Sequence, residues 1–598
     1  MYNELNFRQE DIYMVVKKYA GPYSKKNGSF AAIDDLGRVL PLDNDVTNIR
    51  NDRKVGIFYF LWIGEHGTGG PYDISKIAKE HPESVESEEN WYASGGGSRG
   101  EHHFWGKPLF GYYKSSDEWV MRKHLQMLTD AGVDFIVFDT TNGPTYDERM
   151  AQIIDVWYEY LEKGVNVPKM SFYTNTESGQ TMEHIFKNLY KNEELHKKYP
   201  RLDELWFKHD DKPMIIGLEA EASQEIKEYF TFKESVWPNA GRCDNGFPWM
   251  EFNRSLKPES VYGREGRKEV MNVSVAQHSD TCRFSATAWY GGNDMTRSWH
   301  NGENDTAEDA ILYGYNFAEQ WEYAIEQDPE MVFVTGWNEW VAQRQPAGII
   351  KDEPIWFVDC ATYNCSRDVE PAAEVFGDNY YMQLCNYIRR YKGTLPRVYV
   401  GEENTIDING SFSQWDSDKI TAIYTDYSGD TVKRCAKGFG ELEYVNDTGR
   451  NDFTCLKVCR DSKNIYFYAE TAEEITPSTD DNWMTLFIKA GEDKKEYNYA
   501  VNLEKPEKTG AVLSKSQENG LWERAGEVAM RTESNKMMLA IPRETLGIGS
   551  NLVDLQFKWA DNYKKGEKGQ VDVYSFYCDG DAAPYGRMNY VYSEKTQN

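Results

Sequence analysis

The chain has 598 residues, with 67 Lys and Arg against 97 Asp and Glu, so its formal net charge is −30. Hydrophobic residues make up 40% and aromatic residues 14%, which is enough to bury sizeable cores and excludes wholesale disorder. The negative charge would repel nucleic-acid phosphates and anionic lipids, and no apolar run reaches the roughly 18 residues of a membrane span. We therefore expect several folded domains that neither bind nucleic acid nor insert into a membrane.

The compartment is predicted from the first residues and from the cysteines. The start has no basic stretch followed by an apolar one, so no signal peptide is visible. The nine cysteines are an odd number scattered along the chain, without the paired spacing of a zinc site. We expect reduced thiols, no metal bound by cysteine, and a cytoplasmic protein unless a leader has been removed.

Three zones follow one another along the chain. Residues 1–50 are polar and mixed, and we expect an N-terminal extension that packs on the next zone. Residues 51–398 alternate short apolar runs with longer helical patterns, and we expect the catalytic domain here. From residue 403 to 598 short alternating runs are separated by Asn, Asp and Gly, after a junction that contains Gly and Pro.

The middle zone predicts an α/β fold. Strands are expected at 55–62, 133–140, 168–174, 212–219, 230–237, 273–278, 331–340 and 354–359, and helices at 117–132, 146–164, 307–327 and 371–391. Apolar strands that alternate with amphipathic helices indicate a parallel sheet covered by helices, and eight such strands fit a (β/α)8 TIM barrel. A doubly wound open sheet is the alternative, but it would need a Gly-rich nucleotide turn after its first strand.

The last zone predicts an antiparallel β-sandwich. Alternating runs lie at 463–471, 482–490, 497–503, 536–543, 554–562 and 570–577. Turn residues recur between them, which is typical of a sandwich domain.

Candidate catalytic residues are expected at the carboxyl ends of barrel strands. Glu339 stands in the run GWNEW, where Trp337 and Trp340 would desolvate it and raise its pKa toward that of a general acid. The alternative is that Glu339 pairs with an arginine such as Arg344 and braces the loop.

Asp139 closes the apolar run FIVFD and is the next candidate. Its alternative role is to cap the helix that begins near Tyr146. Asp359, Asp368 and Glu370 are weaker candidates, because their segment also resembles a helix start before Pro371.

Aromatic rings stack on the C–H faces of sugars, while Asn, His and Arg bind sugar hydroxyls. The predicted substrate-binding residues are Trp62, Asp73, His103, Trp105, Tyr113, His278, Asn338, Trp340 and Arg367. For His103 and His278 the alternative is a hydrogen-bonded loop histidine, and for Tyr113 it is rim packing. We expect no metal site at His102 and His103, because adjacent side chains rarely converge.

Three runs in the middle zone, VGIFYFLW, AGVDFIVFDTTN and GWNEW, resemble the glycoside hydrolase 71/99-like superfamily, which includes endo-α-mannosidases. The resemblance covers roughly residues 51–395 and implies a (β/α)8 barrel that acts on glycans. In the endo-mannosidases a second catalytic Glu follows three residues after the Glu of N-E-W. Glu339 matches the first position, but Ala342 occupies the second. The second carboxylate must then come from another strand, with Asp139 preferred over Asp280 and Asp359.

The last zone resembles the carbohydrate-binding sandwiches of the family 9 and DOMON-like type. The resemblance implies stacking platforms for glycans, of which the candidates are Trp415, Trp483, Trp522 and Trp559. Each of them has burial in the core as its alternative. Asp and Asn residues within 445–452 are suited to a structural calcium ion, with a plain turn as the alternative.

The sequence therefore predicts a glycosidase that cleaves an oligo- or polysaccharide of little charge, without an organic cofactor. Glu339 is the expected general acid/base and Asp139 the expected base or nucleophile. One alternative is a non-catalytic glycan-binding protein, which the residue at Ala342 favours. The other is a polysaccharide-assembly protein of the glycosyltransferase type, which would need a diphosphate-binding loop that the sequence does not show.

Overall fold

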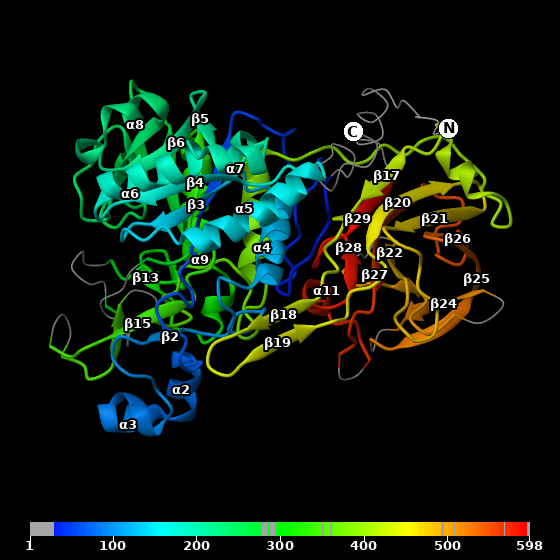
Figure 1. The fold of residues 1–598 in the computed structure, drawn as a ribbon. Coiled ribbons are helices and arrows are strands. Elements are labelled where there is room, and N and C mark those ends of the chain that lie inside the picture. Colours follow the sequence, from blue (N-terminus) through cyan, green and yellow to red (C-terminus); the bar gives the residue numbers. More distant parts are fainter. Residues whose placement is uncertain are drawn as a thin grey trace, which may run out of the picture.

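The computed structural model of the chain describes residues 29–277, 285–286, 293–348, 352–358, 361–491, 495–506, 510–517, 520–566 and 569–594. The described residues form a mixed α/β barrel and an antiparallel β-sheet structure that pack side by side (Figure 1).

Eight parallel strands form the barrel wall in the described part of the chain. They are β1 (Lys54–Tyr59), β3 (Phe135–Thr140), β4 (Lys169–Thr174), β6 (Lys212–Gly217), β7 (Thr231–Val236), β8 (Gly246–Pro248), β10 (Val270–Ser274) and β14 (Met331–Thr335). Their hydrogen-bonded order is β8-β7-β6-β4-β3-β1-β14-β10, so the barrel is nearly closed. At the gap between β8 and β10, the Asn272 side chain donates a hydrogen bond to the Trp249 carbonyl (2.9 Å). The short strands β5 (Lys208–His209) and β9 (Val261–Tyr262) are antiparallel to β6 and β10.

The expected α/β barrel is therefore present, although it is only nearly closed and two of its strands differ from the prediction. The run 354–359 contributes no barrel strand: β16 (Trp356–Val358) lies in a separate sheet with β2 (His102–Phe104), β11 (Ser285–Ala286) and β15 (Val341–Gln345). The sequence missed β8, because this strand has only three residues and ends in Pro248.

Helices cover the outside of the barrel, which explains why the strands are apolar on both faces. They are α4 (Glu118–Ala131), α5 (Asp147–Glu162), α6 (Ser178–Ile185), α7 (Glu193–Lys198), α8 (Gln224–Tyr229), α9 (Tyr315–Gln327) and α10 (Asn379–Lys392). The loop after β1 contains α2 (Ile74–Glu80) and α3 (Glu88–Ala93), and the ribbon β12 (Trp299–His300) and β13 (Glu303–Asn304) precedes α9. None of the described helices is long and apolar enough to cross a bilayer.

The antiparallel part is a barrel-like sandwich. Its strands are β17 (Ala422–Thr425), β20 (Phe453–Arg460), β21 (Asn464–Thr471), β22 (Thr485–Ala490), β23 (Tyr499–Val501), β24 (Ala511–Ser516), β25 (Trp522–Glu533), β26 (Lys536–Pro542), β27 (Asp554–Asp561), β28 (Asp581–Ala583) and β29 (Tyr590–Ser593), with the short helix α11 (Ser575–Cys578) before β28. The long strand β25 pairs with β26 at one end and β24 at the other, so a single sheet folds over on itself.

The indoles suggested as glycan platforms in this part are mostly buried. Trp415, Trp483 and Trp559 are at most 3% exposed, which makes them part of the core. Only Trp522, at the start of β25, is partly exposed.

A two-stranded ribbon, β18 (Arg434–Lys437) and β19 (Glu443–Asn446), reaches from the sandwich to the barrel loops (Figure 1). Phe439 at its tip packs edge-on against Phe104 with ring centroids 4.8 Å apart. Gly440 donates its N–H to the Thr68 carbonyl (2.7 Å), and a Cβ at this position would lie 1.8 Å from the Gly70 carbonyl oxygen. Only glycine fits this close approach of two backbones.

The described residues of the predicted N-terminal extension contact both parts of the molecule. The backbones of Ala31 and Asn589 exchange two hydrogen bonds of 2.9 and 2.8 Å. On the barrel side, Arg389 of α10 donates to the Phe30 carbonyl (2.7 Å).

The cysteines differ from the expectation at one position. Cys365 is disulfide-bonded, whereas Cys243, Cys385, Cys435, Cys455, Cys459 and Cys578 form no disulfide. The expectation of reduced thiols is therefore wrong at Cys365.

Candidate active site

Asp139 lies near the carboxyl end of β3, where the structure turns toward the barrel mouth. Its Oδ2 accepts a hydrogen bond from the Trp62 indole (3.2 Å), and its Oδ1 accepts from the backbone (3.1 Å) and hydroxyl (2.8 Å) of Thr141. Burial raises the pKa of Asp139, and these hydrogen bonds oppose the rise. Asp139 does not cap α5, whose N-cap residue is Tyr146.

Glu339 lies in the loop after β14 and forms an ion pair with Arg367. Arg367 is 1% exposed and its guanidinium lies 5.1 Å from the centre of the Trp249 ring. The charge of Arg367 also lowers the pKa of Asp139, so one arginine acts on both carboxylates. Both Asp139 and Glu339 are 8% exposed. The arginine considered as the alternative partner of Glu339, Arg344, instead binds Glu88 (2.6 Å).

Three of the predicted substrate-binding residues hold the Glu339 loop from inside. The Asn338 side chain pairs with the backbone of Phe60, accepting from its N–H (2.9 Å) and donating to its carbonyl (3.1 Å). Trp105 stacks on Trp340 with ring centroids 4.1 Å apart and donates to the Glu339 carbonyl (2.8 Å). All three side chains are at most 1% exposed, so they position the carboxylate from behind.

Glu370 is the anchor of this loop and is completely buried. Its carboxylate accepts hydrogen bonds from the Trp340 indole (2.5 Å) and the Tyr113 hydroxyl (2.7 Å), and its other oxygen lies 2.9 Å from His124 Nε2. Tyr113, expected to contact substrate, is thus a buried partner of Glu370. Residues 371–378 form an irregular loop, and the helix expected from residue 371 begins only at Asn379.

Asp368 joins the two loops that carry Glu339 and Arg367. Its Oδ1 accepts the backbone N–H of Glu339 (2.5 Å), and the residue is fully buried. Burial raises the pKa of Asp368 to about 6, against the opposing charges of Arg367 and Arg297. Asp368 therefore fixes the position of the Glu339 backbone.

The remaining predicted substrate-binding residues fall into two groups. Asp73 caps α2 by accepting from Lys76 N–H (2.9 Å) and also accepts from the Tyr112 hydroxyl (2.9 Å). His103 is fully buried, accepts from Gly97 N–H (2.9 Å), and burial lowers its pKa to about 3. Both side chains stabilise loops. His278, with the alternative carboxylates Asp280 and Asp359, lies outside the described residues.

The structure adds aromatic and imidazole side chains that the sequence did not single out as binding residues. The His102 ring lies 5.4 Å from Trp62 and 5.9 Å from His66, and His66 Nε2 lies 2.8 Å from the Tyr146 hydroxyl. Burial lowers the pKa of His102 to about 4, so this imidazole is neutral at pH 7. His102 lies on the strand β2, beside the loop of Glu339. The sequence pair His102-His103 alone does not predict this position.

Trp249 and Trp237 form a second aromatic pair, with ring centroids 4.6 Å apart. They follow β8 and β7, and Trp249 lies under Arg367. The sequence missed them as site residues because it missed β8.

A desolvated carboxyl group, Asp139, and an arginine-paired carboxylate, Glu339, thus share Arg367 as a charged neighbour, and the partly buried Trp62 indole binds Asp139. The nearby buried residues fix both carboxylates in place. This arrangement has the residue types that general acid–base catalysis on a glycosidic bond requires.

No protein-family model matches the sequence, and no curated protein matches it. Among solved structures, a GH99 endo-alpha-mannosidase from Bacteroides thetaiotaomicron is similar, with 14% identity over 57% of this chain and 97% of that chain and a TM-score of 0.34. A glycoside hydrolase-like protein matches 57% of this chain and 95% of its own, at 12% identity and a TM-score of 0.29. A bacterial fucosidase matches 84% and 98%, at 10% identity and a TM-score of 0.22. The similar structures are thus glycosidases and a glycoside hydrolase-like protein, at low identity and low score.

Proposed function

We propose that this chain is a glycoside hydrolase whose two working carboxyl groups are Asp139 and Glu339. The observation that carries the proposal is their different setting at one end of the barrel. Asp139 is desolvated and its pKa is raised, whereas Glu339 is paired with the buried Arg367. Two carboxyl groups whose surroundings favour different protonation states are what glycoside hydrolysis needs.

The roles of the two groups follow from these settings and are the reverse of the sequence-based expectation. A buried cation favours the ionised form of its partner, so Glu339 is suited to be the base or nucleophile. Asp139 is suited to donate a proton to the leaving glycosidic oxygen. In the expected arrangement Trp337 would desolvate Glu339, but the Glu339 carboxylate is bound to Arg367 instead.

The proposed reaction needs only groups of this chain and water. Asp139 gives its proton to the glycosidic oxygen as the bond to the anomeric carbon breaks. Glu339 either attacks that carbon or removes a proton from the attacking water. The partly exposed Trp62 indole offers a face for a sugar ring, which suits an oligo- or polysaccharide of little charge.

The test is turnover of a broad panel of glycans, followed by mass spectrometry, for the wild type and three variants. Asp139→Asn and Glu339→Gln should each lose about a thousandfold or more in kcat/KM. The matched control is Glu219→Gln, because Glu219 is an exposed carboxylate that follows β6, another strand of the same barrel. Cleavage that survives in either of the first two variants would contradict the assignment of that residue.

A non-catalytic glycan-binding protein is the second candidate, and one observation favours it. Ala342 is 3% exposed within β15, where it pairs with His103, so the position at which the endo-mannosidases carry a second Glu is part of a buried sheet here. Glycan binding by the wild type without any cleavage, retained in Glu339→Gln, would support this candidate. The third possibility, a nucleotide-sugar enzyme, gains nothing from the Gly-rich residues 95–100, which follow α3 and do not begin a helix.

A further inference from the structure

Three aspartates from separate segments of the sandwich converge next to the barrel. Asp430 lies between β17 and β18, Asp452 precedes β20, and Asp581 begins β28. One carboxylate oxygen of each lies within 4.8 Å of those of the other two. Oxygens on opposite sides of a calcium ion, each bonded at 2.3–2.6 Å, are about 4.6–5.2 Å apart. The spacing therefore suits oxygen ligands around one cation.

Two of these carboxylates are fixed through one oxygen and leave the other unused. Asp452 Oδ2 accepts from Gly429 N–H (2.6 Å), and Asp430 Oδ2 accepts from the Gln126 amide of α4 (3.0 Å). The Oδ1 atoms of Asp430 and Asp452 are buried and have no hydrogen-bond partner within the described part of the chain. Asp430 itself is only 4% exposed. A buried carboxylate oxygen without a partner is costly unless something else binds it.

The charges around the cluster are not balanced. Asp426, 5% exposed, adds a fourth buried carboxylate, and its Oδ2 also has no hydrogen-bond partner among the described residues. Lys123 Nζ is 4.0 Å from Asp430, and the charge of Lys163 also acts on Asp430 and Asp452. Burial lowers the pKa of a third lysine, Lys558, to about 7.

A second acidic cluster in the barrel provides a contrast. His209, Asp210 and Glu269 also come within 4.8 Å of one another. Glu269, however, already binds Lys233 (2.7 Å), and Arg267 binds both Asp210 (3.0 Å) and Glu269 (3.1 Å). That cluster is neutralised by close ion pairs, whereas among the described residues the three sandwich aspartates have only the 4.0 Å pair of Asp430 with Lys123.

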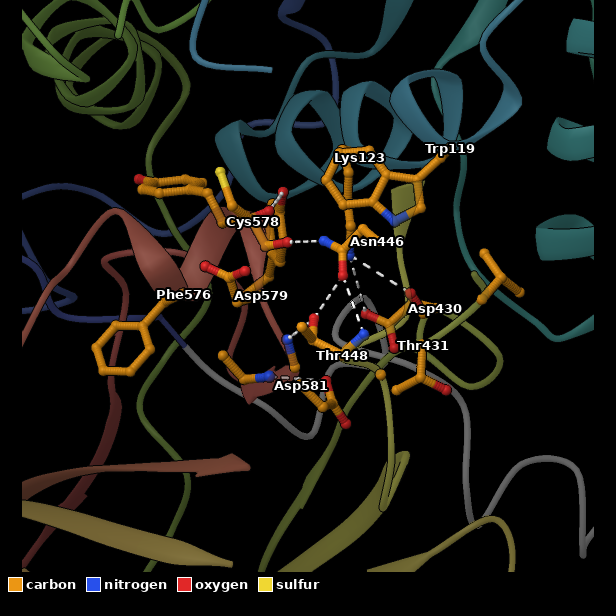
Figure 2. A pocket seen from close by; sticks show the side chains of 16 residues that line it. Trp119, Lys123, Asp430, Thr431, Asn446, Thr448, Phe576, Cys578, Asp579 and Asp581 are labelled. Carbon is orange, nitrogen blue, oxygen red and sulfur yellow. Dashed lines mark hydrogen bonds and ion pairs between the residues drawn. The ribbon is translucent and has the colours of Figure 1, made fainter. Parts of the chain in front are cut away.

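We propose that Asp430, Asp452 and Asp581 bind one divalent cation of the calcium type, which joins the sandwich to helix α4 of the barrel. Figure 2 shows Asp430 and Asp581 in one pocket with Lys123 and Trp119 of α4. This pocket, which Asp430 and Asp581 line and Asp452 does not, has a volume of about 10 Å³, which is room for a single ion or water and excludes a sugar. An all-carboxylate set is typical of a hard cation and not of zinc, which prefers nitrogen and sulfur ligands.

The first test uses the whole chain, stripped of metal with a chelator and then titrated with CaCl2. We expect the midpoint of thermal unfolding to rise by about 2 °C or more, with one calcium per chain in equilibrium dialysis. Terbium should bind the same site and emit on tryptophan excitation, with the emission reduced in Trp119→Phe. No calcium bound in dialysis, or an equal rise with MgCl2 alone, would overturn the assignment.

The matched variants are Asp452→Asn and Asp447→Asn. Asp447 lies in the same loop, but it is exposed and pairs with Lys433 (2.9 Å). Asp452→Asn should lose the calcium-dependent rise and the terbium signal, whereas Asp447→Asn should keep both. Without metal, Asp452→Asn should melt no lower than the wild type, because the substitution removes repulsion. Terbium emission that is equal in the two variants would show only non-specific binding to an acidic chain and would contradict the proposal.

Discussion

The Glu339 carboxylate and the Arg367 guanidinium form an ion pair that joins the loop after β14 to the loop before α10. The residues on either side strengthen this connection. Gly336 N–H donates to the Arg367 carbonyl (2.7 Å), and Glu370 N–H donates to the Trp337 carbonyl (3.0 Å). The position of one proposed working group is therefore set by a segment about 30 residues further along the chain.

Replacement of Arg367 should reduce kcat/KM by more than the accompanying loss of stability explains. Arg367→Met would leave Glu339 without its counter-ion, so we expect a loss of about 100-fold or more in kcat/KM and a lower free energy of unfolding, by about 3 kcal/mol. The control is Arg344→Met, which breaks the pair with Glu88 away from the two carboxylates. That variant should lose stability and keep kcat/KM. Equal losses of activity in both would mean that Arg367 acts only through stability.

The pH profile should report the Asp139 proton. The protonated form is active in the proposed role, so kcat/KM should fall as the pH rises through the raised pKa of Asp139. Trp62→Phe removes a hydrogen bond that favours the carboxylate, which raises this pKa further. The alkaline limb should therefore move to higher pH in Trp62→Phe. A shift to lower pH, or an unchanged limb, would contradict the assignment of Asp139 as the acid.

The ionised form of Asp139 should also lower the free energy of unfolding. Its pKa is higher in the folded chain than in the unfolded chain, so its favourable contribution is present at low pH and is lost as the pH rises through the folded value. At pH 8 Asp139→Asn should therefore unfold at the same temperature as the wild type or at a higher one. A clearly lower unfolding temperature would show that the charged form stabilises the fold.

Glu370→Gln should act in the opposite way to Glu339→Gln. The Glu370 carboxylate binds Trp340, Tyr113 and His124 in a fully buried position. Its replacement should lower the free energy of unfolding by about 3 kcal/mol, measured by denaturant titration. Glu339→Gln should change stability by less than this and abolish turnover. If Glu370→Gln unfolds like the wild type, its role as an anchor is wrong.

The ribbon tip gives a test of the contact between sandwich and barrel. Gly440 has φ of +58° and no room for a Cβ beside Gly70, so Gly440→Ala should detach the tip. We expect faster proteolytic cleavage near residues 438–442 and a lower unfolding temperature. Gly526→Ala, where no atom lies within 4 Å of the added Cβ, is the control and should leave both unchanged.

The strands that the sequence predicted correctly share one property. β1, β3 and β14 are continuous apolar runs between helical patterns, which is a strong local signal. The run around β16 has the same composition but belongs to another sheet, because an apolar run does not specify its partner. β8 has no such run at all, and the site indole Trp249 was missed with it.

The residue types of the candidate site could be proposed from the sequence, but the partners of their side chains could not. Asp139 and Glu339 were predicted from their place at strand ends, and the one arginine named as a partner of Glu339 was Arg344. Only the path of the intervening loops brings Arg367, rather than Arg344, to the carboxylate. Nor could the inward orientation of Trp105 and His103 be predicted, because residue type does not determine which side of a loop a side chain faces.

The described start of the chain limits how the protein can be divided. Ala31 pairs with Asn589, and on the same side of the molecule Arg587 binds Asp378 at the start of α10 through two hydrogen bonds of 2.8 and 2.9 Å. A cut between residues 398 and 403, where the sequence places its boundary, would leave the Arg587 guanidinium without its buried counter-ion and would open the edge beside Asn589. The two parts should therefore melt in a single cooperative transition, and an isolated fragment 403–598 would lack surfaces that its own fold requires.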